Sequence, residues 1–113
     1  MTDLSRLPWL EQKKIAAWTR CRPFGNYPLH EWRLDDFDNP IRRADHGVQS
    51  EYGWEVDHVI AVALGGADSL NNVRALHWRK NRQLGGHVGN ALTGLLGLGD
   101  YALRTARGAG SKG

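Results

Sequence analysis

A chain of 113 residues has room for one domain with a modest core and is too short for two independent cores. Hydrophobic residues make up 41% of it and charged residues 24%, a balance that excludes a wholly disordered chain. The single cysteine, Cys21, excludes an intramolecular disulfide and the cysteine-based zinc sites of many small domains. We therefore expect stability to come from packing, with Cys21 as a small buried residue.

The formal net charge is +3, and its placement is more informative than its sum. Residues 1–53 balance eight basic side chains against eight acidic ones. The four basic residues of 54–86 lie within nine positions of one another: Arg74, Arg79, Lys80 and Arg82. A local basic patch of this kind suits a phosphate backbone, although solvated basic helix faces are also common.

From the N-terminal residues we expect no secretory signal. Residues 1–10 lack the basic-then-apolar order of a signal peptide, and the apolar stretches stay far below the ~20 residues that span a bilayer. We therefore expect a cytoplasmic protein that does not contact a membrane.

The first half of the chain predicts a short amphipathic helix and then an irregular segment. Ser5 and Pro8 are helix-start signals, and the apolar residues from there to Thr19 have roughly helical spacing. Over 22–53, prolines and glycines separate single aromatic residues, a pattern typical of irregular chain with short turns. We expect this segment to wrap a small core, with its aromatic rings as anchors.

The strongest pattern begins after Gly53. Apolar and polar residues alternate over 54–60, which predicts a strand, and a second short strand is expected over 72–76 after a glycine-containing loop. Residues 77–84 favour a helix that ends at Gly85-Gly86. The predicted order is therefore strand, loop, strand, helix, with the tryptophans at both ends of this unit in the core.

Four polar residues of this unit could carry chemistry: Asp57, His58, Asn72 and Asn81. A hairpin packed against a helix can bring them together. Carboxylate and amide oxygens are the hard ligands that Mg²⁺ or Mn²⁺ prefers, and Mg²⁺ often uses only one or two protein carboxylates. A histidine, with a reference pKa of ~6.5, can take a proton from water near neutral pH.

The run from Gly53 to Arg82, GWEVDHVIAVALGGADSLNNVRALHWRKNR, resembles the HNH endonuclease motif in its His-Asn-Asn form. The paired Asp-His, the Gly-Gly loop, Asn72 and Asn81 all fall at motif positions, and weaker similarity extends upstream over 32–47. The resemblance implies an α+β fold, in which a ββα-metal hairpin-helix core is wrapped by an N-terminal helix and an irregular aromatic-rich segment.

The resemblance also implies a role for each motif residue. Asp57 would bind the divalent metal and Asn81 would complete its site, His58 would activate water, and Asn72 would orient His58 through the loop backbone. We expect Mg²⁺, with Mn²⁺ or Ni²⁺ as alternatives. Within one domain, residues 1–53 are then the N-terminal helix and wrapping segment, 54–86 the catalytic core, and 87–113 a Gly-rich, partly flexible C-terminal segment.

Two further residues have open roles. His77 could be an auxiliary ligand, a phosphate contact or a packing residue, and Glu55 shares the strand face of Asp57 and could support its site. His77 and Lys80 also stand where many relatives place a pair of zinc-binding cysteines. The resemblance therefore places the chain with members that lack structural zinc.

The activity implied is divalent-metal-dependent hydrolysis of phosphodiester bonds in DNA, with little sequence preference, in phage packaging, restriction or DNA processing. Arg74, Arg79, Lys80 and Arg82 are candidate phosphate contacts, although a short helix cannot point them all the same way. The implied partners are DNA and, for packaging, a phage terminase or another DNA-processing protein, and we expect a monomer or weak dimer. The alternatives are a catalytically weak DNA-binding module that acts with a partner, and a structural domain without a divalent metal.

Overall fold

A computed structural model describes residues 3–85, which contain two antiparallel sheets, two α-helices and several short 3₁₀ turns. The helices are α1 (Trp9–Thr19) and α2 (Trp78–Gln83). The strands are β1 (Arg22–Pro23), β2 (Trp32–Leu34), β3 (Pro40–Arg42), β4 (Trp54–His58) and β5 (Val73–His77). This mixture confirms the predicted α+β class. Over residues 3–85, no helix has the length and apolar character needed to cross a membrane.

The centre of the fold is a hairpin of β4 and β5, which α2 follows at once. The two strands pair antiparallel, with Trp54 opposite His77 and Asp57 opposite Arg74. The helix ends before Gly85, whose φ of 107° is a left-handed conformation that favours glycine. The predicted order of strand, loop, strand and helix is confirmed.

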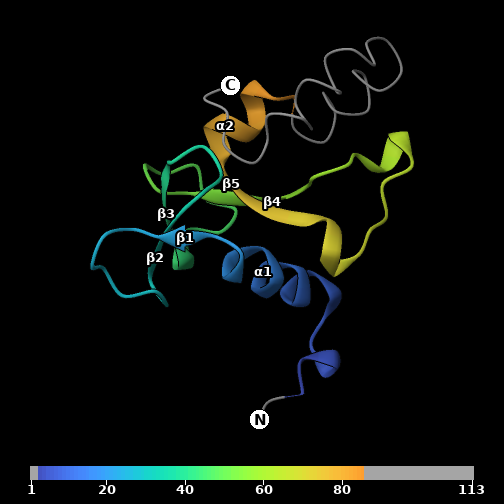
Figure 1. The fold of residues 1–113 in the computed structure, drawn as a ribbon, viewed down its shortest axis with the longest axis horizontal. Coiled ribbons are helices and arrows are strands. Elements are labelled where there is room, and N and C mark those ends of the chain that lie inside the picture. Colours follow the sequence, from blue (N-terminus) through green and yellow to red (C-terminus); the bar gives the residue numbers. More distant parts are fainter. Residues whose placement is uncertain (1–2, 86–113) are drawn as a thin grey trace.

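The hairpin lies between the two helices, with α1 against one face and α2 against the other (Figure 1). The α1 face carries the main core, where the rings of Trp18 and Trp54 approach to 5.5 Å between centroids. The same buried cluster contains Ala17, Cys21, Ile41, Val73 and Ala75. The predicted burial of Trp54 and Cys21 is therefore confirmed, whereas Trp78 is only half-buried.

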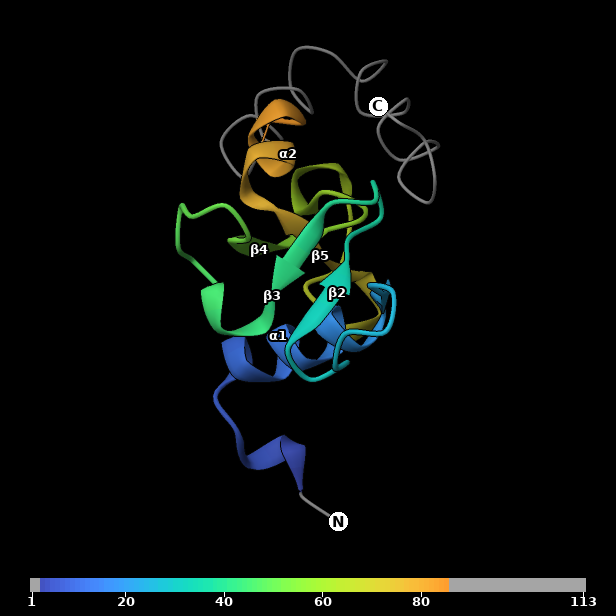
Figure 2. The ribbon, with the colours of Figure 1, turned by 90° about the vertical axis from the view of Figure 1, so that its left-hand side faces the viewer.

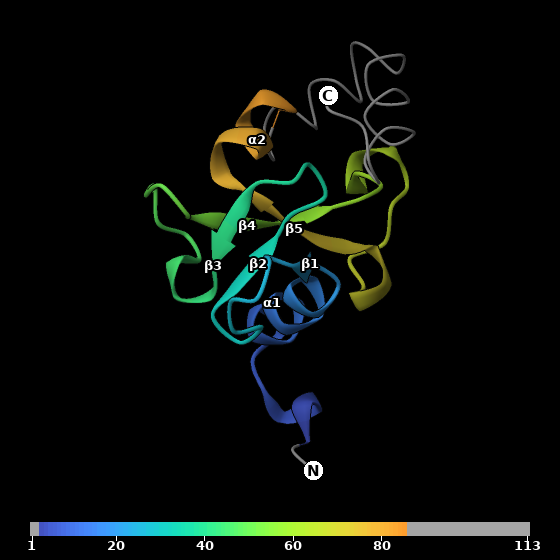
Figure 3. The same cartoon turned by 60° about the vertical axis from the view of Figure 1, so that its left-hand side comes forward.

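The segment between α1 and β4 is more regular than predicted. Strands β1, β2 and β3 form a three-stranded antiparallel sheet, in which Arg22 pairs with Leu34 and Arg33 with Ile41. Figures 2 and 3 show β2 and β3 beside the hairpin, with α1 beneath them. The interpretation as irregular chain was wrong here because strands of two or three residues are too short for a detectable alternation.

The first helix is shorter than predicted. Residues Leu4–Arg6 form a separate 3₁₀ turn, and α1 starts only after Pro8. The proline disfavours helical backbone at the residue before it, and Leu7 is accordingly extended. Near the start of α1, Trp9 and Leu10 stay exposed, so the helix buries only the residues near its C-terminal end. The predicted C-terminal segment, 87–113, lies outside the described residues.

Candidate active site

Side chains alternate between the two faces of the hairpin along β4, so its polar side chains lie on opposite faces. Glu55 and Asp57 lie on the face that α2 covers, whereas His58 lies on the face of α1. The structure therefore brings Asp57 and Asn81 to one face and places the ring of His58 on the other.

Asp57 is buried, with 2% of its surface exposed, and it pairs with a buried arginine. Arg74 stands opposite it on β5, and Nε of Arg74 lies 3.2 Å from Oδ2 of Asp57. The same guanidinium reaches Asp36 through Nη1, at 3.3 Å from Oδ2. Burial raises the pKa of Asp36, an effect that the nearby Arg74 opposes. One buried cation is thus shared between two carboxylates.

The structure places Arg74, a candidate phosphate contact from the sequence, in the protein interior. Only 4% of the residue is exposed, and its guanidinium also packs over the ring of Phe37, with 5.7 Å between the guanidinium carbon and the ring centroid. In this position it faces the protein interior and not a phosphate backbone. Arg74 is the first residue of the basic cluster in the sequence, but its position on strand β5 directs its side chain into the protein.

Asn81 is the buried polar residue of α2, with 3% of its surface exposed. Its Nδ2 donates to Oε1 of Glu55 at 2.9 Å, which fixes the orientation of the amide. Its Oδ1 is buried and has no hydrogen-bond partner among the described residues. Buried amide oxygens normally accept a hydrogen bond, so the lack of a partner for this oxygen indicates that a ligand binds there.

Asn72 ties together the two ends of the loop between β4 and β5. Its Oδ1 accepts from the backbone N–H of Ile60 at 2.9 Å, and its Nδ2 donates to the carbonyls of Ile60 and Ala67, both at 2.8 Å. The chain approaches so closely here that a Cβ on Gly66 would lie 1.9 Å from the carbonyl oxygen of Ile60. Asn72 and Gly66 therefore fix the backbone directly after His58.

His58 lines a cavity of about 230 Å³ beside α1. Its Nε2 lies 2.9 Å from Oδ1 of Asp68, and 15% of its side chain is exposed. The cavity is also lined by Leu10, Lys13, His46, Gly47, Glu55 and Val56. Because Glu55 both lines this cavity and holds Asn81, it joins the surroundings of His58 to the face of Asp57.

Residues 43–86 match the HNH endonuclease family model. This match confirms the resemblance of the sequence to the HNH family and indicates nuclease activity on nucleic acid. No curated protein and no solved structure matches the chain significantly. The HNH segment contains β4, β5 and α2, and therefore Asp57, His58, Asn72 and Asn81.

HNH nucleases generally use divalent metals, and the residues on the α2 face fit such an ion. Asp57 offers a carboxylate, and Asn81 offers the amide oxygen that lacks a protein partner. Among residues 3–85, no three His, Cys, Asp or Glu side chains gather as a metal cluster. A sparse site of one carboxylate and one amide oxygen, completed by water, is nevertheless of the type that Mg²⁺ accepts.

His77 has a structural role in the HNH segment. Its Nδ1 accepts from the backbone N–H of Arg79 at 3.1 Å and so caps α2. Its Nε2 must then carry the hydrogen, which it donates to the carbonyl of Glu51 at 2.7 Å. Its own backbone N–H donates to Oδ2 of Asp35 at 2.9 Å. Of the roles left open for His77, this arrangement supports packing and capping, since both ring nitrogens are already engaged.

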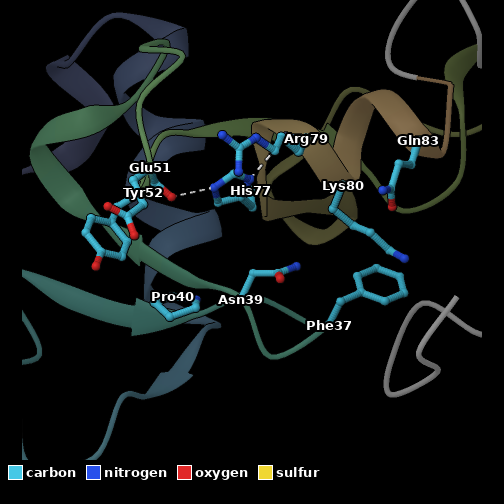
Figure 4. A pocket seen from close by; sticks show the side chains of 9 residues that line it. All are labelled: Phe37, Asn39, Pro40, Glu51, Tyr52, His77, Arg79, Lys80 and Gln83. Carbon is cyan, nitrogen blue, oxygen red and sulfur yellow. Dashed lines mark hydrogen bonds between the residues drawn. The ribbon is translucent and has the colours of Figure 1, made fainter.

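The other basic residues of the HNH segment lie on α2. Arg79 and Arg82 are exposed, with their guanidinium carbons 5.1 and 5.6 Å from the centroid of the Trp78 ring. Figure 4 shows Arg79, Lys80 and Gln83 on one side of an open groove of about 530 Å³. The groove is also lined by Phe37, Asn39, Pro40, Glu51, Tyr52 and His77. The surface of α2 is therefore basic, even though Arg74 does not contribute to it.

The sequence did not indicate three residues that contact the candidate site or line its cavity: Asp36, His46 and Asp68. Asp36 and Asp68 lie in loops, and their contacts with Arg74 and His58 depend on how distant segments pack. His46 lines the cavity and packs edge-on against Trp54, with 4.9 Å between ring centroids, and its pKa is lowered by burial and then by Lys14. Only its position in the stretch before the motif could have drawn attention to it.

Proposed function

We propose that this protein is a divalent-metal-dependent endonuclease that hydrolyses phosphodiester bonds in DNA. Asp57 and Asn81 hold the cation, for which Mg²⁺ is the expected ion, and His58 is the general base. Asn72 positions His58 by fixing the loop that follows it. Exposed basic residues of α2 contact phosphates of the substrate.

The buried Oδ1 of Asn81 is the observation that carries this proposal. An unsatisfied buried acceptor costs about 1–3 kcal/mol, so a protein that keeps one normally gives it a ligand. Glu55 holds the amide by Nδ2, which leaves the oxygen as the ligating atom. Asp57 lies on the same face of β4 as Glu55, and a carboxylate with an amide oxygen is a donor pair for a hard cation.

In the proposed reaction, His58 acts as the base, and other residues of the chain hold the cation and fix the loop after His58. His58 removes a proton from a water, the water oxygen forms a bond to phosphorus, and the bond from phosphorus to the leaving oxygen breaks. A bound divalent cation supplies positive charge for the phosphate and the leaving oxygen. Glu55 joins the His58 cavity to the metal-binding face, and Asn72 keeps the backbone after His58 in place.

The proposed substrate contacts are made to the DNA backbone. Arg79 and Arg82 are exposed on α2, and Lys80 lines the groove on the same helix. Contacts to phosphates position a protein without reading sequence. We therefore propose cleavage with little sequence preference.

One observation favours a second candidate, a DNA-binding module with weak catalysis. Arg74 already provides a cation to the carboxylate of Asp57, at 3.2 Å. If this ion pair persists in the presence of divalent metal, Asp57 cannot serve as a strong ligand. The protein would then hold DNA for a partner that cuts it.

Cleavage of supercoiled plasmid by the purified protein tests both candidates. We expect nicking with Mg²⁺ or Mn²⁺, no nicking in EDTA, and loss of nicking in His58→Ala with retained DNA affinity. His30→Ala is the matched control, because His30 is exposed and outside the site. Folded wild-type protein that binds DNA but cleaves it with no metal would support the binding module instead.

A further inference from the structure

Four aromatic side chains form a surface cluster that is separate from the main core. The rings of Phe24 and Tyr27 approach to 4.9 Å between centroids, and the Tyr27 ring lies 6.0 Å from that of Trp32. The Trp32 ring in turn lies 4.8 Å from that of Tyr52. Tyr27 exposes 55% of its surface, and the other three residues are only half-buried. Aromatic residues that cluster at a surface in this way are typical of binding sites.

This aromatic cluster is continuous with the open groove beside α2. Tyr52 belongs to both, because its ring contacts Trp32 and also lines the groove of about 530 Å³. Figure 4 shows Tyr52 at one end of the groove and Lys80 and Phe37 at the other. The ammonium of Lys80 lies 4.4 Å from the centroid of the Phe37 ring. The groove therefore leads from the basic surface of α2 to the aromatic cluster.

The charges and rings along this path suit an unpaired nucleic-acid strand. Arg79 and Lys80 line the groove, and Glu51 is the one acidic residue among the described residues that line it. Helix α2 contains three basic residues and no acidic one. Proteins that bind single strands combine a positively charged groove, which follows the phosphates, with aromatic rings on which bases stack. A duplex stacks its bases on one another, so only an unpaired strand offers free base faces to such rings.

We propose that the groove and the aromatic cluster bind an unpaired DNA strand that extends from the duplex on which the nuclease acts. Arg79 and Lys80 contact phosphates of this strand, and its bases stack on Tyr52 and Tyr27. Trp32 contacts both tyrosine rings and so holds them in place. This inference rests on the proposed nuclease function and names its substrate class, which is duplex DNA with an adjoining single-stranded segment.

Fluorescence anisotropy in EDTA tests this binding without cleavage. The probes are a labelled blunt duplex and the same duplex with a single-stranded extension of about six thymines, on its 5′ or its 3′ end. A third probe carries an extension of the same length that has the phosphates and sugars but lacks the bases. We expect the thymine extension of one polarity to raise the affinity at least about fivefold, the effect of one stacked base. The extension without bases should raise it less, because it supplies charge and no stacking.

Substitutions that remove the rings test which residues stack. Tyr27→Leu and Tyr52→Leu keep an apolar side chain, and with both changes the protein should bind the thymine extension and the extension without bases equally. Tyr27→Phe and Tyr52→Phe keep the rings and should keep the preference for thymine. Leu4→Ala is a further control, because Leu4 is an exposed apolar residue on the N-terminal 3₁₀ turn. If the double variant does not fold, Tyr27→Leu alone serves, since its side chain is largely exposed.

The outcomes separate this inference from the proposed function. Protein that binds the blunt duplex but gains nothing from either extension, or gains equally with and without bases, overturns the inference and leaves the nuclease in place. Protein that prefers the thymine extension but cleaves no DNA with any metal overturns the nuclease instead. Protein that binds none of the probes overturns both. Self-association in analytical ultracentrifugation that is lost in Tyr27→Leu, with the preference for thymine unchanged, would show that the cluster is a contact between two copies of the chain and overturn the inference.

Discussion

The guanidinium of Arg74 lies 3.2 Å from the carboxylate of Asp57, and the two residues stand directly opposite each other on β5 and β4. Both side chains are almost fully buried, and Arg74 also bonds Asp36 at 3.3 Å. The carboxylate that we assign to a divalent cation is therefore already beside a fixed protein cation. This arrangement gives the buried carboxylate of Asp57 a hydrogen-bonding partner within the protein.

Replacing Arg74 should lower the stability of the protein and raise its affinity for a divalent metal. In Arg74→Gln, the buried carboxylate of Asp57 and the half-buried carboxylate of Asp36 lose their cation. Breaking the buried pair with Asp57 in this way costs about 3–5 kcal/mol of the free energy of unfolding. Mn²⁺ should restore part of this loss in the variant, because the ion then faces no competing guanidinium at Asp57. Urea unfolding in EDTA and in Mn²⁺ measures both effects. The competition between Arg74 and metal is disproved if Mn²⁺ stabilises the wild type more than Arg74→Gln.

Asn81→Ala should weaken metal binding without unfolding the protein. The substitution removes an unsatisfied acceptor, which favours the metal-free fold, and also the hydrogen bond to Glu55, which opposes that gain. Titration calorimetry with Mn²⁺ should show a loss of affinity of at least about tenfold, as expected when one oxygen of a sparse site is removed.

Asn71→Ala is the matched control for this experiment, because Asn71 is exposed and lies outside the proposed site. Its Mn²⁺ affinity should equal that of the wild type. Unchanged affinity in Asn81→Ala would show that the orphaned oxygen does not bind the cation.

The basic residues of α2 should act through salt-sensitive contacts. Arg79→Gln and Arg82→Gln should each weaken DNA binding similarly for unrelated sequences and reduce the slope of log K against log salt by about 1. Fluorescence anisotropy in EDTA measures this without cleavage. Arg6→Gln is the control, since Arg6 is exposed on the N-terminal 3₁₀ turn and pairs with Asp3. A slope that changes as much in Arg6→Gln would mean that α2 is not the interface.

The hairpin and α2 could be predicted from the sequence because their signals are local. Alternation marks β4, the double glycine marks the loop, and a basic run before Gly85 marks a short helix. The opposite orientation of Asp57 and His58 also follows from the period of a strand. The motif residues themselves could therefore be named before their positions were known.

Their partners could not be predicted in the same way. Arg74 faces Asp57 because of the register across a long loop, and Asp36 joins them from a position 38 residues before Arg74. Asp68 meets Trp9 over 59 positions. Such contacts depend on how segments pack in three dimensions, and one sequence carries no direct signal for them. The burial of Arg74 is the clearest example, because a basic cluster in the sequence predicts side chains exposed on the surface.

The buried thiol of Cys21 allows a test of the core that is independent of activity. Burial, followed by the charges of Asp36 and Asp35, raises the pKa of this thiol from 9.0 to about 12. Only the thiolate reacts with iodoacetamide, so at about pH 9 the native protein should react at least a hundredfold more slowly than the urea-unfolded chain. Because the pKa is higher in the folded state, the thiol's contribution to stability is complete below pH 9.0 and is lost as the pH rises towards about 12. Cys21→Ala should therefore lose less stability than the wild type across this interval. Equal alkylation rates in the folded and unfolded states would show that the core against α1 opens readily.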